Sequence, residues 1–567
     1  MCQLHQAILS VFIALQFVVW PSAQAYTLNL TEHCDNHQIY YCTLSNITVT
    51  LQDPLIVPKT TGLQLSELIL RDSIIPRIPS ALLAEAPTLR SFTMHNCELK
   101  RLTVFDYPSG LPLRALVLQM NRISDVPEKA FVSLYELEKL QLGHNMIFMV
   151  HKNAFDGLEK LRYLDLQQND IRELPATLFD ELINLEHIDL SSNNIEKIDA
   201  LTFAHNAKLQ TVLLGDNRFS VFESNALAHL PHLHLLDISS SANVDALRLQ
   251  SVDTLLVQGS TLQSILIEGS VIKVHAGNNL LNSLKIDDKL SVRELDLHGN
   301  RLETLECAMG MLNLQRLDVS RNQLRTLSTS NSPLYLPLPN LVHLNLATNK
   351  LQNLTLDNFL MLQKLTHLDL AFNNLLSLDQ RVFEALVNLE KFYIEGNRLH
   401  AFGYEKFVAA HEYLKEFGMF ENEWEYRYMR KMYSYLQERN IQLPVRFASN
   451  NGITLDTTLN SNSPSSPDKA ATHHRYASTA SSVSDFVASS DGPAAAMTDI
   501  SGIHPYFTTR DVLTLVILLL VFLILLLQLF SFLKEEECLP NCCNRIARNA
   551  GANNRRRLQE DEEDSEV

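Results

Sequence analysis

The stretch from Leu113 to Phe219 repeats one pattern five times, as LRALVLQMNRI, LEKLQLGHNMI, LRYLDLQQNDI, LEHIDLSSNNI and LQTVLLGDNRF. The pattern is L-x-x-L-x-L-x-x-N-x-L, in which other apolar residues can replace Leu. Its asparagines recur every 24 residues, at Asn121, Asn145, Asn169, Asn193 and Asn217. A second series keeps the same spacing between them, at Phe131, Phe155, Phe179 and Phe203. Two series locked in one register indicate a repeating structural unit.

Each part of the pattern has a physical interpretation. In L-x-L the apolar residues alternate with variable ones, so a short strand points its leucines inward and its variable residues outward. The Asn amide has both donor and acceptor groups for the backbone of the following turn. This is the signature of leucine-rich repeats. It predicts an α/β fold, a leucine-rich repeat solenoid with parallel strands on its concave face. The apolar run near the C-terminus adds a single predicted transmembrane helix after the solenoid.

The repeats are predicted to fill residues 59–424, as about sixteen units between Ser73 and Asn422. Between 241 and 322 the steps shorten to 19, 19, 21 and 22 residues, and the Phe series is interrupted from 204 to 358. Shorter repeats cannot carry the same convex arm, so we expect curvature or twist to change there. A Pro-rich insertion at 331–340 predicts a bulging loop, and this central region is where we expect a surface individual to the protein.

The N-terminal region predicts secretion. Residues 1–25 resemble a secretory signal peptide, with an apolar run before Ala23-Gln24-Ala25; an N-terminal membrane anchor is the alternative. Residues 26–58 are predicted to cap the first repeat, with Cys34 and Cys42 paired in a disulfide. Sequons predict glycosylation; their acceptors are Asn29, Asn46 and Asn353.

The C-terminal region predicts a membrane anchor. A helical cap at 425–447 leads into a Ser/Thr-rich stalk at 448–510 that is too polar to fold. Residues 511–533 are predicted to be a transmembrane helix, since the 22 residues from Val512 to Leu533 extend about 33 Å. Basic residues follow it, so residues 534–567 form a short cytoplasmic tail of a single-pass type I protein in the plasma membrane, with the repeats extracellular.

The tail carries two candidate sites. Cys538, Cys542 and Cys543 are candidates for palmitoylation, with plain reduced thiols as the alternative. The end of the chain, with Ser565 and Val567, matches a ligand for a PDZ-type cytoplasmic partner.

Composition and motifs point away from catalysis. The net charge of −17 argues against nucleic acid as a partner. No catalytic, phosphate-binding or closely spaced Cys/His motif occurs, so we predict no enzyme activity, no metal and no cofactor. Binding is instead expected at the outward strand positions. The alternatives are that the Asp residues there support turns and that the His residues are ordinary solvated residues. The candidates there are Asp165, His187, Asp189, Asp237, Asp296, Asp318, His343, His367, Asp369 and Tyr393.

The segment NEWEYRYMRKMYSYLQERNIQL, at 422–443, resembles a more specific family. It is similar to the N-x-W-x-C, helix and I-x-V/L that close the solenoid in mosquito leucine-rich-repeat immune proteins. With the signal peptide and the predicted membrane span, the chain resembles the transmembrane branch of that family. Tyr426 stands where the family usually has Cys, so a disulfide in the cap is not implied. The secreted members' coiled coil and double-Cys motif are also absent, so their disulfide-linked complex is not implied.

The resemblance implies a non-catalytic cell-surface receptor of innate immunity that binds an extracellular protein or a pathogen-derived ligand through the solenoid. Two alternatives fit the same architecture. One is a developmental or neuronal adhesion protein, and the other is a co-receptor scaffold for another membrane protein.

Overall fold

The computed structural model of the 567-residue chain describes residues 41–49, 64–104, 106–231, 233–327, 335–449 and 452–455. All of them fall within one compact unit, 1–481. The predicted signal peptide, membrane span and cytoplasmic tail lie outside the described residues, as do Asn29, Cys34 and the two candidate sites of the tail. Within the described residues, no helix has the length and apolar character needed to cross a bilayer.

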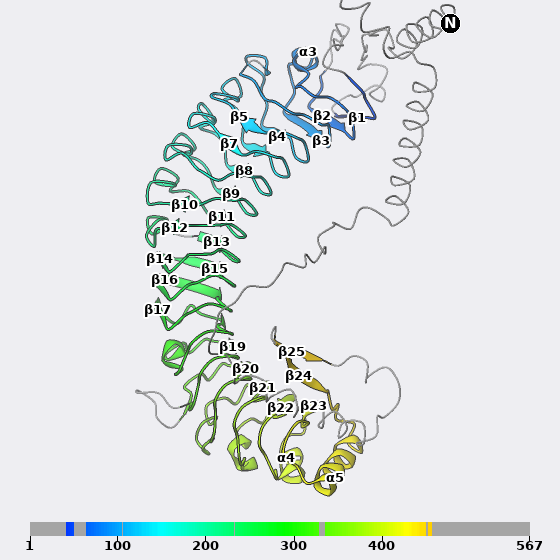
Figure 1. Ribbon diagram of the computed structural model, residues 1–567, viewed down its shortest axis with the longest axis vertical. Helices are drawn as coiled ribbons and strands as arrows, with labels where there is room; N and C mark the ends of the chain where they lie inside the picture. Colours follow the sequence, from blue (N-terminus) through cyan, green and yellow to red (C-terminus); the bar gives the residue numbers. More distant parts are fainter. Residues whose placement is uncertain are drawn as a thin grey trace, which may run out of the picture. The chain divides into compact units, whose positions relative to one another are not determined.

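The described residues confirm the predicted parallel-strand solenoid (Figure 1). Each coil contributes one short strand, and each strand pairs in parallel with the strands of the coils before and after it. Because the apolar residues of the strands are buried, this concave sheet covers one side of the core. In pairing order its strands are β1 (Tyr41–Ser45), β2 (Glu67–Arg71), β3 (Ser91–His95), β4 (Ala115–Val117), β6 (Lys139–Gln141), β8 (Tyr163–Asp165), β9 (His187–Asp189), β11 (Thr211–Leu213), β13 (Leu233–Asp237), β15 (Val252–Leu256), β16 (Ser264–His275), β18 (Glu294–Asp296), β19 (Arg316–Asp318), β20 (His343–Asn345), β21 (His367–Asp369), β22 (Lys391–Tyr393) and β23 (Glu416–Gly418).

The return arms of the coils hold only short elements. Most of an arm is turns, which place a buried Phe against the back of the sheet. The arms therefore add core volume without a continuous helical layer. Their elements are the helices α3 (Ser80–Ala84) and α4 (Tyr404–Ala410), the 3₁₀ helices η1 (Glu306–Ala308) and η2 (Gln380–Phe383), and the strand pairs β5 (Asp125–Val126) with β7 (Met149–Val150) and β10 (Lys197–Ile198) with β12 (Val221–Phe222).

The repeated Asn joins neighbouring coils at each turn. The side chain of Asn193 is 5% exposed, and its amide donates hydrogen bonds to the carbonyl oxygens of Leu166, at 3.0 Å, and Leu190, at 3.1 Å. Its Oδ1 accepts the backbone N–H of Ile171 at 3.1 Å. One side chain thus satisfies backbone groups of two coils, which would otherwise be buried without partners.

The Phe series forms a stack along the return arms. The rings of Phe131 and Phe155 lie 6.3 Å apart, those of Phe155 and Phe179 lie 6.4 Å apart, and those of Phe179 and Phe203 lie 5.6 Å apart, each pair nearly parallel. Stacking resumes between Phe359 and Phe383, at 5.7 Å. Each ring therefore fills the space between two coils.

The short central repeats close differently. Here the return arms are extended and pair in parallel as a second sheet, which runs from β14 (Ala246–Leu249) through the first half of β16 to β17 (Ser283–Asp288). An extended arm spans the coil with fewer residues than a turn-rich arm that carries a Phe. The 12 residues of β16 serve both sheets, its second half lying in the concave sheet. The Pro-rich insertion lies partly outside the described residues.

The C-terminal cap contains the predicted helix as α5 (Tyr426–Gln437). Met432 and Leu436 are fully buried, and Met429 and Tyr433 of the predicted face pack on the core with partial exposure. The predicted disordered stalk begins at residue 448, but strand pairing continues beyond that point. β24 (Arg446–Ser449) and β25 (Gly452–Leu455) form an antiparallel hairpin, because backbone pairing needs no buried apolar side chains.

Three side chains bear on the predictions for secretion and cysteine chemistry. Asn46 and Asn353 are exposed, as an acceptor of glycosylation must be. Cys97, which replaces the repeated Asn in its coil, is fully buried and contacts the carbonyl oxygen of Leu70 at 3.4 Å. Cys97 is therefore placed as a structural thiol.

We expect Asn193→Ala to lower the free energy of unfolding by about 2–4 kcal/mol, because it leaves several buried backbone groups without partners. Urea-induced unfolding of the full-length chain measures this. The matched control is Asn194→Ala, since Asn194 is partly exposed and its side chain donates one long hydrogen bond on the surface, to Asp170 at 3.4 Å. Equal losses for the two variants would contradict the structural role of the repeated Asn.

Candidate binding surface on the concave sheet

The predicted acidic column serves the turns of the coils. In each case the aspartate Oδ1 accepts the backbone N–H of the residue two positions later, as Gln167 donates to Asp165 at 3.0 Å. Asp165 and Asp189 are buried. This arrangement fixes the chain where it leaves the strand. The same bond occurs at Asp189, Asp237, Asp296, Asp318 and Asp369.

Asp369 differs from the other members because its own coil supplies no second donor. Ser191, Ser239 and Ser320 each donate a side-chain hydroxyl to the aspartate two residues before. His298 Nδ1 does so for Asp296, at 2.7 Å. The corresponding residue after Asp369 is Ala371, which has no polar side chain. Part of the Asp369 carboxylate is therefore left to face the concave surface.

The predicted histidines lie in two places on the sheet. His187 stacks on Tyr163, with ring centroids 4.3 Å apart, whereas His343 and His367 face each other on β20 and β21 at 5.2 Å. Desolvation lowers the pKa of all three imidazoles. Near neutral pH these rings are therefore uncharged and can donate and accept hydrogen bonds.

Strands β22 and β23 add a charged and aromatic group beside the histidines. Lys391 Nζ lies 2.6 Å from Glu416 Oε1, and the Tyr393 hydroxyl donates to Glu416 Oε2 at 2.5 Å. Burial opposes ionisation of Glu416, but these two hydrogen bonds hold its pKa below the usual value. Burial and Glu416 together raise the pKa of Tyr393, so the phenol keeps its proton. The phenol ring is thereby fixed on the sheet.

Glu395 supplies a buried carboxylate two residues after Tyr393. Its side chain is 1% exposed, and its Oε2 has no hydrogen-bond partner among the described residues. A Cβ at position 418 would lie 2.0 Å from that oxygen, so the absence of a side chain at Gly418 makes room for Glu395. Burial raises the pKa of Glu395, although the charge of Arg446 lowers it. A carboxylate in this place needs a cation to remain ionised.

Arg446, from the hairpin, supplies that cation. Its terminal nitrogens lie 2.8 and 3.2 Å from the two oxygens of Asp369, and its Nε donates to Glu395 Oε1. The guanidinium carbon lies 3.7 Å from the centre of the Tyr393 ring. Desolvation opposes the charge of Arg446, but Asp369 and Glu395 raise its pKa above the usual value. We call Asp369, Tyr393 and Glu395 the guanidinium pocket.

Of the residues in this region, the sequence predicted His343, His367, Asp369 and Tyr393, and the structure brings these four together. The sequence does not predict the part that Glu395, Glu416 and Arg446 play in this region. Glu395 occupies a strand-end position where most other coils carry Ala, Gly, Ser or Gln, so an acidic residue there is the one sequence signal for this site. Arg446 is 77 residues from Asp369 and lies outside the repeat register, so no periodic pattern indicates their contact.

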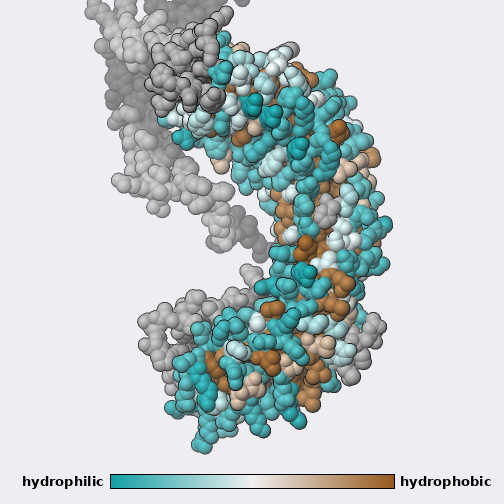
Figure 2. Space-filling model, turned by 180° about the vertical axis from the view of Figure 1, so that it is seen from behind, coloured by the Kyte–Doolittle hydropathy of each residue, from teal (hydrophilic) through white to brown (hydrophobic). Residues whose placement is uncertain are grey.

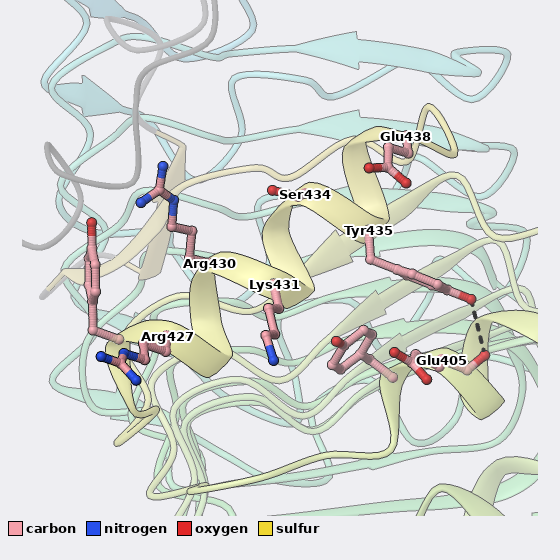
Figure 3. Close-up of a pocket in the computed structure, with 9 residues that line it drawn as sticks. Glu405, Arg427, Arg430, Lys431, Ser434, Tyr435 and Glu438 are labelled. Atoms are coloured by element: carbon pink, nitrogen blue, oxygen red, sulfur yellow. Dashed lines mark hydrogen bonds between the residues drawn. The ribbon is translucent and has the colours of Figure 1, made fainter.

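A second polar surface lies on the cap. A groove of about 680 Å³ between α4 and α5 is lined by Arg427, Arg430 and Lys431 together with three tyrosines (Figure 3). The Tyr435 hydroxyl hydrogen bonds the Glu405 carbonyl oxygen across it, at 3.5 Å. The groove is open and its cations are exposed, so it is a weaker candidate than the concave surface.

Figure 2 shows one flank of the solenoid. Polar side chains cover most of that face, and apolar ones gather in small groups between them (Figure 2). Within the described ranges, no group of three or more His, Cys, Asp or Glu side chains is arranged to hold a metal ion.

Comparisons with known proteins agree with the fold. The leucine rich repeat family matches residues 112–171, 172–242 and 339–399. A chain of the Drosophila Toll–Spatzle complex is 19% identical, with a TM-score of 0.52; the match covers 67% of this chain and 57% of that one. A chain of the LRIM1/APL1C complex is 17% identical, with a TM-score of 0.50, and covers 94% of this chain and 92% of its own. The APL1 leucine-rich repeat domain is 20% identical, with a TM-score of 0.48, over 69% and 90% of the two chains. A search for similar curated proteins gives no match.

We expect the double variant His343→Gln/His367→Gln to lose less stability than the wild type when the pH falls from about 7.5 to about 5.5. Both pKa values are lowered in the folded chain, so the unfolded state binds more protons below about pH 6.5, and stability is lost there. Unfolding by urea at several pH values measures this difference.

The control for that experiment is His298, whose pKa is shifted in the opposite direction to those of His343 and His367. Asp296 raises the pKa of His298, so the stabilisation from His298 is present at low pH and lost as the pH rises. His298→Gln should therefore make acidification more damaging. The same pH dependence in all three proteins would contradict these assignments.

Proposed function

We propose that the chain is a non-catalytic leucine-rich repeat receptor of the cell surface, and that it binds a protein or microbial ligand on the concave surface of β20–β23. We place it in innate immunity. Binding by such a surface requires no reaction, only a rigid sheet that presents polar and aromatic groups in fixed positions.

The observation that carries this proposal is the row of half-buried polar and aromatic side chains on β20, β21 and β22. On β8, β9, β13, β18 and β19 the outward aspartates are occupied by turn hydrogen bonds. On β20, β21 and β22, the side chains of four residues are half-buried and lie side by side in adjacent strands: His343, His367, Lys391 and Tyr393. Half-buried polar and aromatic groups lose little conformational freedom on binding, so they favour specific contacts.

The class of ligand and the immune setting have separate support. In the Toll–Spatzle complex a chain of similar fold has a protein partner, and we carry over only that class of ligand. The immune role is supported by the resemblance of residues 422–443 to the cap of mosquito immune proteins. The cell-surface location is supported by the apolar run at 511–533, with its basic C-terminal flank.

Proximity labelling on living blood cells tests the docking surface. The full-length chain fused to a labelling enzyme is compared with His367→Ala/Lys391→Ala, which removes two concave side chains. We expect the variant to lose a defined set of extracellular partners, with labelling reduced at least about tenfold, because central interface residues each contribute more than about 1 kcal/mol.

The matched control is Lys406→Ala/Tyr413→Ala, which removes a cation and an aromatic ring from the return-arm side. It should keep the wild-type partners. If the concave and control variants label the same partners as the wild type, ligand docking on β20–β23 is wrong. Expression separates the roles: induction in blood cells after infection supports immunity, and expression confined to embryonic or neural tissue supports adhesion.

A further inference from the structure

The guanidinium pocket is filled by a side chain that does not belong to the sheet. Arg446 comes from the β24–β25 hairpin, whose two strands pair with each other and form a sheet separate from the solenoid. Figure 1 draws this hairpin on the inner side of the solenoid, and the ion pairs of Arg446 place its side chain on β21 and β22. The strands of the hairpin are therefore not paired with the concave sheet, and the hairpin contacts that sheet through the Arg446 side chain.

The pocket matches the shape of a guanidinium, not merely its charge. Asp369 receives two terminal nitrogens, Glu395 receives Nε, and the Tyr393 ring covers one face of the planar group. An ammonium is a compact charge that cannot meet two carboxylates in a fork and stack on a ring at the same time. The pocket should therefore prefer arginine to lysine.

The walls of the pocket are held by the solenoid itself. The backbone N–H of Ala371 donates to Asp369, and the Tyr393 hydroxyl donates to the carboxylate of Glu416. Glu395 fits beside Gly418 because that residue has no side chain. The unpartnered Oε2 of Glu395, on a side chain that is 1% exposed, leaves an acceptor in the wall that Arg446 does not use. The solenoid thus supplies all three walls of the pocket, and the hairpin supplies only the occupant.

From this arrangement we propose that Asp369, Tyr393 and Glu395 form a binding site for an arginine side chain of a partner protein, and that Arg446 occupies the site until the partner displaces it. The inference rests on the proposed function, because it takes the concave surface as the docking surface. It adds the chemistry that the partner must present and a competitor within the same chain.

A tethered competitor weakens binding in a calculable way. The apparent dissociation constant equals the intrinsic constant divided by the fraction of chains with an open pocket. If Arg446 fills the pocket in about nine chains of ten, removing it tightens partner binding about tenfold.

The first experiment measures fluorescence anisotropy with the full-length chain in a mild detergent. The probe is a labelled Gly/Ser peptide with one arginine, and the comparison peptide has citrulline, a neutral analogue, in its place. We expect Arg446→Gln to bind the arginine peptide about tenfold more tightly than the wild type, with no change for the citrulline peptide. Asp369→Asn combined with Arg446→Gln should remove the gain.

The control for folding is the urea unfolding midpoint of each variant. If Arg446→Gln stays folded but binds the arginine peptide no more tightly than the wild type, the proposal is wrong and Arg446 is a structural clamp. An equal gain with the citrulline peptide would also overturn it, because the pocket would then not select the charge.

A second measurement uses the unaltered chain, so it stands even if Arg446→Gln fails to fold. Hydrogen exchange of the hairpin is followed with excess agmatine, a free guanidinium, or with putrescine, a diamine. Agmatine should speed exchange at 446–455 more than putrescine does; equal rates with and without agmatine would overturn the proposal. If these probes behave as expected but the concave variants keep all partners, the proposed function fails while the pocket stands. If instead the concave variants lose their partners but the probes do not behave as expected, the pocket is wrong and the proposed function stands.

Discussion

The structure depends on the hydrogen bonds that the repeated Asn makes between coils. A solenoid whose coils turn sharply must bury backbone groups at every turn, and a side chain with one acceptor and two donor hydrogens satisfies them in one place. In coils that lack Asn, another side chain makes some of these hydrogen bonds. Ser73 accepts the backbone N–H of Ile47 at 3.0 Å and donates to the Arg71 carbonyl oxygen at 2.8 Å, which satisfies fewer groups. Stability is therefore transmitted from coil to coil, and each turn depends on the next.

Most of the fold follows from the sequence because it repeats. Leu, Asn and Phe in fixed register determine the parallel sheet, the turn hydrogen bonds and the stack of rings. The extended return arms of the short repeats are less predictable, since the spacing indicates only that a shorter arm is needed. From the sequence, most of the strands Arg446–Ser449 and Gly452–Leu455 is assigned to a stalk because of the polar composition that follows, although Asn450-Asn451-Gly452 is a turn signal between them.

The candidate site was half predictable for a related reason. A residue's position in the repeat tells whether it faces the concave side, which identifies His343, His367, Asp369 and Tyr393. It does not tell whether that side chain is already occupied. The Ser191 hydroxyl donates a hydrogen bond to Asp189, whereas Ala371 has no side-chain donor for Asp369. The residue that decides whether the carboxylate is occupied thus lies two positions after it. Contacts such as Asp369 with Arg446 depend on how the chain returns after its last repeat, which periodicity does not describe.

The two parallel sheets of the short repeats have a geometric consequence. Strands paired by backbone hydrogen bonds lie about 4.8 Å apart. In most coils only the concave side has this fixed spacing, so the return arms can spread and the stack can bend. Where β14, β16 and β17 pair, both sides are held to the same spacing. Equal spacing on two sides is the condition for a straight stack, so bending of the solenoid belongs to the coils on either side of this segment.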